Sequence, residues 1–235
     1  MPDFTPYRIA RREQLTPTII SFTLQPETGQ LIEYQPGQFV MVGVYDKAGQ
    51  IIAKKPYSIC STPTNKHELQ LSYKIQGEFT HRLAELREND RVAIAGPFGV
   101  FTLRPQTTRD VVLLAGGIGL TPLLGMLRYA ADNNITQNFT LLYAVRSPEE
   151  LAFKTELDIL AQQHPNIKCV YFAESFSDDW SGERGRITPE LLKIYSDPMA
   201  AKEYYICGPP IFIQIMIKLL ADGGVPAQQV HNEKF

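Results

Sequence analysis

Ala115-Gly116-Gly117-Ile118-Gly119-Leu120-Thr121-Pro122 is the stretch of this 235-residue sequence that decides how it folds. It follows the apolar run Val111–Ala115 and opens Thr121–Ala131, where apolar residues recur at helical spacing. Glycines let a backbone approach phosphate closely, and a helix amino terminus offers unpaired N–H groups with partial positive charge. The stretch therefore predicts the phosphate-binding turn of a nucleotide-binding domain, with Thr121 capping the helix and Pro122 at its first position.

A second turn, Cys207-Gly208-Pro209-Pro210, also follows an expected strand and precedes an expected helix. Ligands of parallel sheets gather at the carboxyl ends of the strands, so we expect the two turns to face one crevice. Each turn has a plainer interpretation when it is taken alone. Pro122 stands where the standard dinucleotide fingerprint has its third glycine, so the first can be a tight turn without a ligand. The second can simply hold a buried structural thiol.

The second half of the chain alternates strands with helices from Arg109 onward. Besides the first pair, the expected strands are Phe139–Ala144, Lys168–Phe172 and Tyr204–Cys207, and the expected helices are Pro148–Gln163, Ile187–Ile194 and Ile211–Ala221. Strands this apolar, alternating with helices, predict a parallel sheet covered on both faces. We therefore expect an α/β nucleotide-binding domain over residues 109–235, after a linker at Arg104–Arg109.

The first half, residues 1–104, has a different periodicity. Turn-forming residues separate six short β segments: Tyr7–Arg12, Ile19–Leu24, Gln38–Val44, Pro56–Cys60, Leu69–Lys74 and Arg91–Ala95. This pattern predicts a small antiparallel β-barrel with one helix at Thr80–Leu86.

Two segments of the expected barrel carry groups suited to a cofactor. Lys55-Pro56-Tyr57-Ser58 combines a cation, an aromatic ring and a hydroxyl, which suit a phosphate, a flavin face and the flavin ring edge. Strand alternation places Lys55 and Tyr57 on one side and Ser58 on the other. Lys74–Thr80 sets a glycine before a helix whose first turn holds a threonine, a second anion-binding pattern. The alternatives are an ordinary edge strand and an ordinary capped helix.

Composition excludes several classes of partner. With a net charge of −2 and no block of lysine and arginine, nothing favours binding to nucleic acid or to an anionic membrane. No apolar run reaches the roughly 18 residues of a membrane-spanning helix. The three cysteines are far apart, which favours free thiols in a reducing, cytoplasmic compartment, and the four histidines lack metal-ligand spacing. We expect no metal site.

Taken together, these segments resemble the ferredoxin–NADP reductase superfamily over essentially the whole chain. Lys55-Pro56-Tyr57-Ser58 is similar to its Arg-x-Tyr-Ser flavin motif, and Gly77–Thr80 to its flavin-pyrophosphate turn. Gly96-Pro97-Phe98-Gly99-Val100-Phe101 resembles its domain-closing loop, and the two glycine turns resemble its nicotinamide-nucleotide motifs. In this sequence Lys55 replaces the arginine of the family, and the iron–sulfur module fused to many relatives is missing.

The resemblance implies an NAD(P)H oxidoreductase that moves hydride to FAD, with FMN a less favoured cofactor, and passes electrons to a separate ferredoxin, flavodoxin or oxygenase partner. It implies that Tyr57 stacks on the flavin, Ser58 lies near N5, and Cys207 lies beside the nicotinamide, with Glu233 and the terminal Phe235 near the same rings. The implied cofactor-binding residues are Lys55, Pro56, Tyr57, Ser58, Tyr73, Lys74, Gly77, Phe79, Thr80, Gly117, Gly119, Thr121, Pro122, Arg146, Cys207, Gly208 and Pro209. Glu174, after the third strand, favours NADH modestly over NADPH. An electron-transfer subunit and a non-enzymatic nucleotide-binding module are the alternatives.

The substitution Lys55→Arg tests the placement of residue 55 on the flavin pyrophosphate. A guanidinium binds phosphate through two parallel hydrogen bonds, whereas an ammonium is a point charge. We therefore expect Lys55→Arg to tighten flavin binding in a fluorescence titration of the apoprotein. Unchanged or weaker binding would remove residue 55 from the phosphate.

Overall fold

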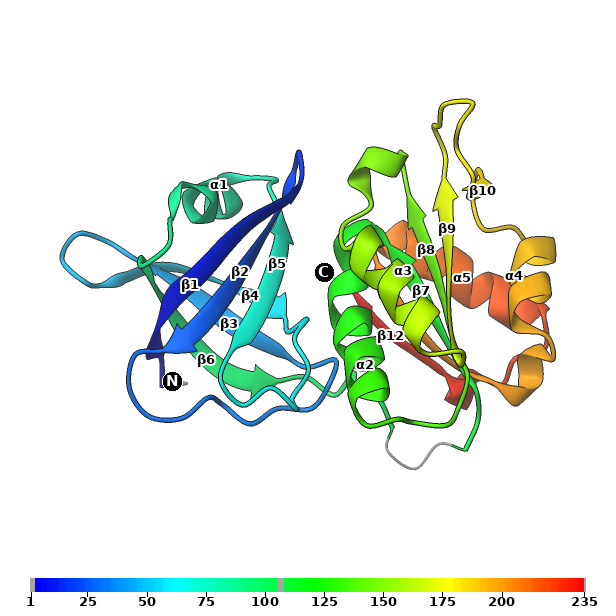
Figure 1. Ribbon diagram of the computed structural model, residues 1–235, viewed down its shortest axis with the longest axis horizontal. Coiled ribbons are helices and arrows are strands. Elements are labelled where there is room, and N and C mark those ends of the chain that lie inside the picture. The colour runs from blue at the N-terminus through cyan, green and yellow to red at the C-terminus, as the bar shows by residue number, and fades with distance from the viewer. Residues whose placement is uncertain (1–2, 105–107, 235) are drawn as a thin grey trace. The chain divides into compact units, whose positions relative to one another are not determined.

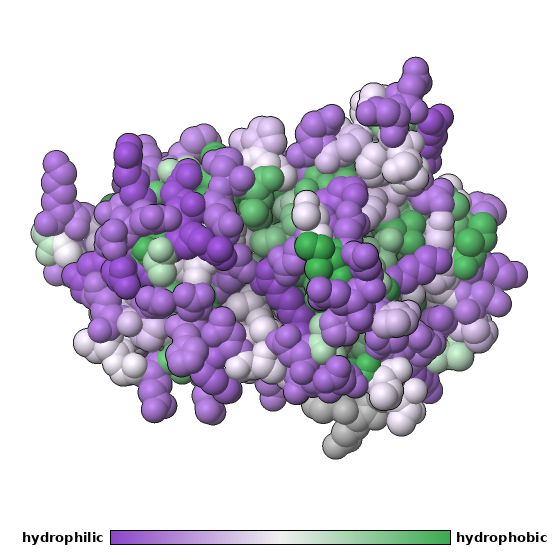
Figure 2. All heavy atoms as spheres, viewed as in Figure 1, coloured by the Kyte–Doolittle hydropathy of each residue, from purple (hydrophilic) through white to green (hydrophobic). Residues whose placement is uncertain are grey.

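The computed structural model describes residues 3–104 and 108–234, in which the chain forms two compact units (Figure 1). The first contains the described residues up to Leu103 together with Leu124–Tyr129, and the second contains the others. Among these residues, no helix is long and apolar enough to cross a membrane. Hydrophilic side chains predominate on the face shown in Figure 2, with apolar residues interspersed.

The first unit is an antiparallel β-barrel. Its strands are β1 (Thr5–Thr16), β2 (Ile19–Pro26), β3 (Phe39–Tyr45), β4 (Ile51–Ser58), β5 (Leu69–Lys74) and β6 (Arg91–Phe98), joined by one helix, α1 (Glu78–Glu85). Their order in the sheet is β4-β3-β6-β1-β2-β5. An antiparallel bridge between Ile59 and Leu71 joins the chain after β4 to β5, so the two edges of the sheet meet. The predicted barrel is confirmed.

Strand β4 differs most from its expected range, because it begins at Ile51 and not at Pro56. Apart from the half-buried Ala53, the residues of β4 before Pro56 are exposed, and the segment shows no apolar alternation, so no core pattern predicts a strand there. Pairing with β3 extends the strand, with Val42 opposite Lys55. The turn that joins the strands is closed by Asp46, whose Oδ1 accepts the Ala48 and Gln50 amides at 2.9 Å.

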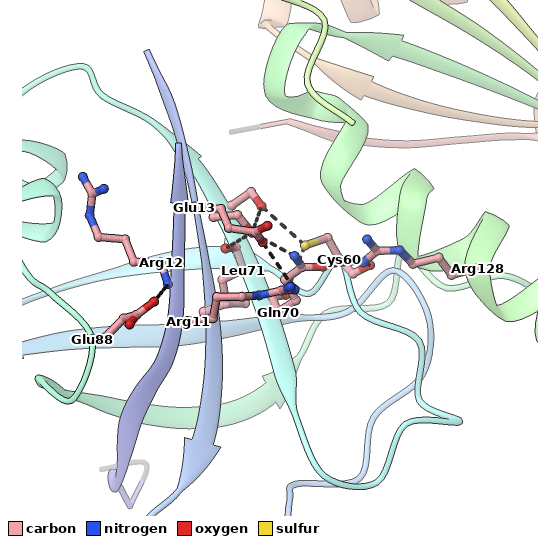
Figure 3. Close-up of polar contacts among 10 residues, drawn as sticks. Arg11, Arg12, Glu13, Cys60, Gln70, Leu71, Glu88 and Arg128 are labelled. Carbon is pink, nitrogen blue, oxygen red and sulfur yellow. Dashed lines mark hydrogen bonds and ion pairs between the residues drawn. The ribbon is translucent and has the colours of Figure 1, made fainter. Parts of the chain in front are cut away.

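A buried polar network crosses one side of the barrel (Figure 3). The Gln70 Nε2 donates to Ser21 Oγ at 3.0 Å, and Ser72 Oγ donates to the same oxygen at 2.9 Å. Arg128, in the part of α2 (Leu120–Asp132) that groups with this unit, donates to Gln70 Oε1 at 2.5 Å and to the Cys60 carbonyl at 2.7 Å. Because each of these buried polar groups is paired, they fix the packing without the cost of an unsatisfied donor.

The second unit is a parallel sheet with helices. Its strands are β7 (Val111–Gly116), β8 (Phe139–Val145), β9 (Ile167–Ala173), β10 (Glu183–Arg184), β11 (Glu203–Gly208) and β12 (Val230–Lys234). Besides α2, its helices are α3 (Lys154–Gln163), α4 (Pro189–Ser196) and α5 (Pro210–Asp222), and Figure 1 shows α3 in front of the sheet and α5 behind it. The strand order is β10-β9-β8-β7-β11-β12. The chain adds β8, β9 and β10 on one side of β7 and then β11 and β12 on its other side, so the carboxyl ends of β7 and β11 form a topological switch point. The predicted α/β domain is confirmed, with β10 and β12 as additional strands.

Candidate functional site

The two predicted glycine turns pack directly against each other. Strands β7 and β11 are neighbours, with Ala115 opposite Cys207, so both turns leave the same edge of the sheet. An ideal Cβ on Gly119 would lie 2.3 Å from the Cys207 carbonyl oxygen and 2.6 Å from the Gly208 nitrogen. Only glycine fits this contact. The sequence-based expectation that the two turns share one edge therefore agrees with the geometry.

The first turn differs from its expected form. A 3₁₀ turn at Gly117–Gly119 leads straight into α2, which begins at Leu120. Thr121 is therefore inside the helix, and its hydroxyl donates to the Ile118 carbonyl at 3.1 Å, so the expectation that it caps the helix is wrong. The added 3₁₀ turn causes the difference, because it moves the start of the winding to Gly117. Pro122 is the third residue of the helix and not the first.

Gly117 is the part of this turn open to a ligand. Its φ of 55° lies in the left-handed region, and a Cβ there would meet nothing within 4 Å. The first amides of a helical turn have no intrahelical acceptor and point outward at its amino end. The turn is thus built to offer backbone N–H groups to an anion.

Cys207 is a buried thiol at the second turn. Its side chain is fully buried, and burial raises its pKa well above the usual value, with the nearby Glu233 carboxylate adding to the effect. The thiol therefore stays protonated at neutral pH and is a poor nucleophile. Gly208 is buried and Pro209 exposed beside it. Phe235 lies outside the described residues.

The barrel gathers three of the predicted residues into an aromatic cluster. The Tyr57 ring lies 6.0 Å from the Phe79 ring in a stacked arrangement and 6.0 Å from the Tyr73 ring edge-on. Tyr57 is half-buried, and burial raises its pKa. The Tyr73 hydroxyl is buried and has no hydrogen-bond partner among the described residues. A buried polar group without a partner costs about 1–3 kcal/mol, so this site fits a ligand that supplies one.

The remaining predicted residues of the barrel lie at the ends of the same elements. Lys55 and Pro56 are exposed on β4, Ser58 is half-buried at its end, and Lys74 is half-buried at the end of β5. Gly77 precedes α1 with a φ of 103° and open space at its Cβ.

Thr80 is occupied by its own turn. Its hydroxyl donates to the Gly77 carbonyl at 3.0 Å and accepts the Gln76 amide at 2.8 Å. The threonine therefore shapes the turn before α1, and an anion there would meet mainly backbone N–H groups.

A third group lies beyond β8 and β9. Arg146 is exposed, and its carbonyl accepts the Ser175 amide at 2.7 Å, which links the ends of the two strands. Glu174 Oε2 lies 2.9 Å from Arg186 Nη2. The carboxylate that was expected to repel a phosphate is therefore also paired with the nearby cation.

Two other features lie outside the predicted set. A cavity of about 480 Å³ lies at the carboxyl end of α1, lined by Arg12 and residues 84–87, and contains no predicted site residue.

Sequence analysis also missed Glu203, a buried acid at the start of β11. The only signal was a charged residue opening an otherwise apolar run. Among residues 3–104 and 108–234, no group of His, Cys, Asp and Glu is placed to hold a metal ion.

Comparison with known proteins identifies two successive domains. Residues 6–103 match the family described as "Oxidoreductase FAD-binding domain", and residues 113–218 match "Oxidoreductase NAD-binding domain". The chain is 30% identical to the flavohemoprotein of Bacillus subtilis over 99% of its own length and 59% of the relative. It is 31% identical to that of Xylella fastidiosa over 97% of the chain and 57% of the relative. The chain thus spans about three fifths of these relatives.

Solved structures agree with these matches. The flavohem-like FAD/NAD-binding domain of nitric oxide dioxygenase from Vibrio cholerae superimposes with a TM-score of 0.90 at 27% identity, covering 99% of both chains. A ferredoxin NADP⁺ reductase from Neisseria gonorrhoeae, with bound FAD and NADP, has a TM-score of 0.82 at 25% identity, covering 98% of both chains.

The substitution Gly119→Ala tests the contact between the two turns. Its methyl group would overlap the Cys207 carbonyl, so we expect a loss of unfolding free energy of about 1–3 kcal/mol or more in urea denaturation. Gly117→Ala is the matched control, because its methyl group meets open space and it bears only the left-handed backbone cost, about 1–2 kcal/mol. If Gly119→Ala destabilises no more than Gly117→Ala, the turns do not pack as described.

Proposed function

The chain belongs to the ferredoxin–NADP reductase superfamily, and from this we propose that it takes hydride from NAD(P)H onto bound FAD and passes the electrons to a separate acceptor. One observation carries the proposal. The glycine-only contact between the Gly117–Gly119 turn and the Cys207–Gly208 turn lies at the switch point of the NAD-binding domain. The first domain of the proposal covers residues 1–104 and the second covers 109–235.

In the barrel, we assign the flavin to the aromatic cluster. A bound flavin would have Tyr57 at a face of its ring and Ser58 near ring N5, with Phe79 stacked behind Tyr57. The orphaned Tyr73 hydroxyl supports this assignment, because a bound flavin would give it a partner. Lys55, Lys74 and the backbone from Gly77 to Thr80 bind the pyrophosphate, while Pro56 fixes the strand between Lys55 and Tyr57.

In the second domain, we assign the dinucleotide to the two turns. The backbone of Gly117 and Gly119, followed by Thr121 and Pro122, holds the pyrophosphate. Cys207, Gly208 and Pro209 line the nicotinamide subsite, with Glu233 beside them on β12, and Arg146 binds the adenosine end. We assign Phe235 to the same subsite from the resemblance alone.

The chemistry of the reaction belongs to the cofactors. FAD, when bound, supplies a ring that accepts a hydride and releases electrons one at a time. The residues of the chain align the donor and keep water out. Burial raises the pKa of the Cys207 thiol well above its usual value, so the thiol is protonated and a poor proton donor. It therefore fills space beside the nicotinamide and performs no acid–base step.

The proposal includes two alternatives to an independent reductase and a cellular compartment. The chain serves either as an independent reductase or as the electron-transfer subunit of a larger flavoenzyme, and its acceptor is a redox protein in both cases. A non-enzymatic nucleotide-binding module is the third option. Cys60, Cys169 and Cys207 form no disulfide, which supports a reducing compartment, the cytoplasm.

The absorbance spectrum of the purified protein tests the proposal. We expect the blue-region bands of an oxidised flavin, and their bleaching by NADH under anaerobic conditions. The released cofactor is identified by chromatography, with FAD expected and FMN as the contrary result. A protein that binds no flavin after reconstitution, yet binds NADH, would be a nucleotide-binding module.

The Glu174–Arg186 pair generates a prediction about donor preference. We expect the protein to prefer NADH modestly, because Glu174 repels a 2′-phosphate and holds the cation that would bind it. Glu174→Gln removes the repulsion and releases Arg186. The catalytic efficiency with NADPH relative to NADH should rise about two- to fivefold, the scale of an exposed ion pair. Glu190→Gln, an exposed acid of α4, is the control. A native preference for NADPH, or an unchanged ratio in Glu174→Gln, contradicts the assignment.

A further inference from the structure

Glu203 is a buried carboxylate with two partners. It opens β11 and is 3% exposed. Its Oε1 lies 3.4 Å from Arg109 Nη1, and its Oε2 lies 3.2 Å from His231 Nε2. The Arg109 side chain is 49% exposed and the Glu203 side chain only 4%. Because a buried charge needs partners, Glu203 depends on this contact far more than Arg109 does.

His231 ties the last strand of the sheet to this carboxylate. It is the second residue of β12 and lies opposite Tyr205 of β11 in the strand pairing. The imidazole and the Tyr205 ring lie 4.8 Å apart, so His231 is held by ring packing as well as by Glu203. A side chain with both contacts has one well-defined position.

Gln229 provides a second anchor just before β12. It is 2% exposed, and its Nε2 donates to the carbonyl oxygens of Ala200 at 2.9 Å and Lys202 at 2.6 Å. Gln229 and His231 are alternate residues; Gln229 bonds to the segment just before β11, and His231 bonds to Glu203, the first residue of β11. We call these two residues and Glu203 the register clamp. Among the described strands, β12 pairs with β11 alone, and an edge strand depends on such contacts for its register.

The register of β12 against β11 determines which β12 residues lie beside the Cys207–Gly208 turn. Glu233 lies opposite Cys207, and Lys234 lies opposite Gly208. A slip of one residue would turn every side chain of β12 to the other face of the sheet. The clamp at the amino end of β11 therefore determines which β12 residue stands beside the turn at its carboxyl end.

We infer that Glu203 is a positioning residue: with His231 and Gln229 it sets the register of β12 and so places Glu233 beside Cys207. The role of Glu233 there rests on the proposed function, whereas the clamp does not. A buried charged group is a weak source of stability, because desolvation offsets most of its attraction, and setting register is the best-attested use of such groups. The chemistry of the three residues fits that use.

The test uses the full-length, flavin-loaded protein with Glu203→Leu, His231→Phe and Glu203→Gln. Glu203→Leu removes both bonds, and His231→Phe keeps a ring on Tyr205 but loses Nε2. Glu203→Gln keeps an oxygen that accepts from His231, so it should restore most of the native behaviour. Glu149→Leu, at an exposed acid outside the clamp, is the control.

Three measurements follow. Amide hydrogen exchange over residues 230–234 should accelerate about tenfold in Glu203→Leu and His231→Phe, the factor for one lost charge-assisted hydrogen bond. Alkylation of Cys207 by iodoacetamide, measured on its peptide, should accelerate in the same variants. The KM for NADH should rise several-fold in both variants while kcat changes less, and Glu203→Gln should stay near the native values.

Each of the following results would contradict one step of the inference. Unchanged exchange over residues 230–234 in both variants would show that the clamp does not hold β12. Faster exchange with unchanged Cys207 alkylation and unchanged KM would show that it positions nothing. If NADH fails to reduce the flavin of the native protein, the proposed function fails, and exchange and alkylation still decide the clamp. A large fall in melting temperature for Glu203→Leu alone leaves His231→Phe as the deciding variant.

Discussion

Gly119 lies so close to the Cys207 carbonyl that a methyl group on it would fall 2.3 Å from that oxygen. This contact requires two adjacent parallel strands that end together, and β7 and β11 meet that requirement at the point where the strand order reverses. The contact leaves no room for a side chain on Gly119, and Gly117 beside it is half-buried with open space at its Cβ position, so its backbone is accessible. Backbone N–H groups recognise a pyrophosphate through its charge and shape. The placement of the proposed dinucleotide site therefore depends on this single approach.

The proposed flavin site in the barrel differs from the dinucleotide site, because it is made of side chains. Tyr57, Tyr73 and Phe79 come from β4, β5 and α1, and their rings meet only because the barrel closes between β4 and β5. The network around Gln70 satisfies the polar groups on that side of the barrel, whereas the Tyr73 hydroxyl is left without a partner among the described residues. Among the described residues of the barrel, the Tyr73 hydroxyl is the buried side-chain polar group left without a partner, and its place within the aromatic cluster supports a ligand there.

The sequence predicts those parts of the fold whose pattern is local. An apolar strand, a glycine turn and an amphipathic helix identify the nucleotide domain, and short strands separated by turns identify the barrel. The missed features depend on pairing between distant segments. Strand β12, Val-His-Asn-Glu-Lys, has one apolar residue and is a strand because β11 pairs with it. The start of β4 exists because β3 pairs with it, and the burial of Glu203 follows from its partners Arg109 and His231. Among the proposed site residues, Thr121 was expected to cap a helix that in fact begins before it.

Strand β11 links the two ends of the second domain. All six of its residues are buried, and it pairs with β7 on one side and β12 on the other. At about 3.3 Å per residue, Glu203 and Gly208 are separated by roughly 16 Å of rigid backbone. A buried, doubly paired strand transmits position along its length, because a shift at one end would break every ladder bond and move every packed side chain. The polar anchors at the amino end and the glycine contact at the carboxyl end therefore constrain one and the same element. This is why a carboxylate so far from the proposed nicotinamide subsite can determine which residues of β12 line it.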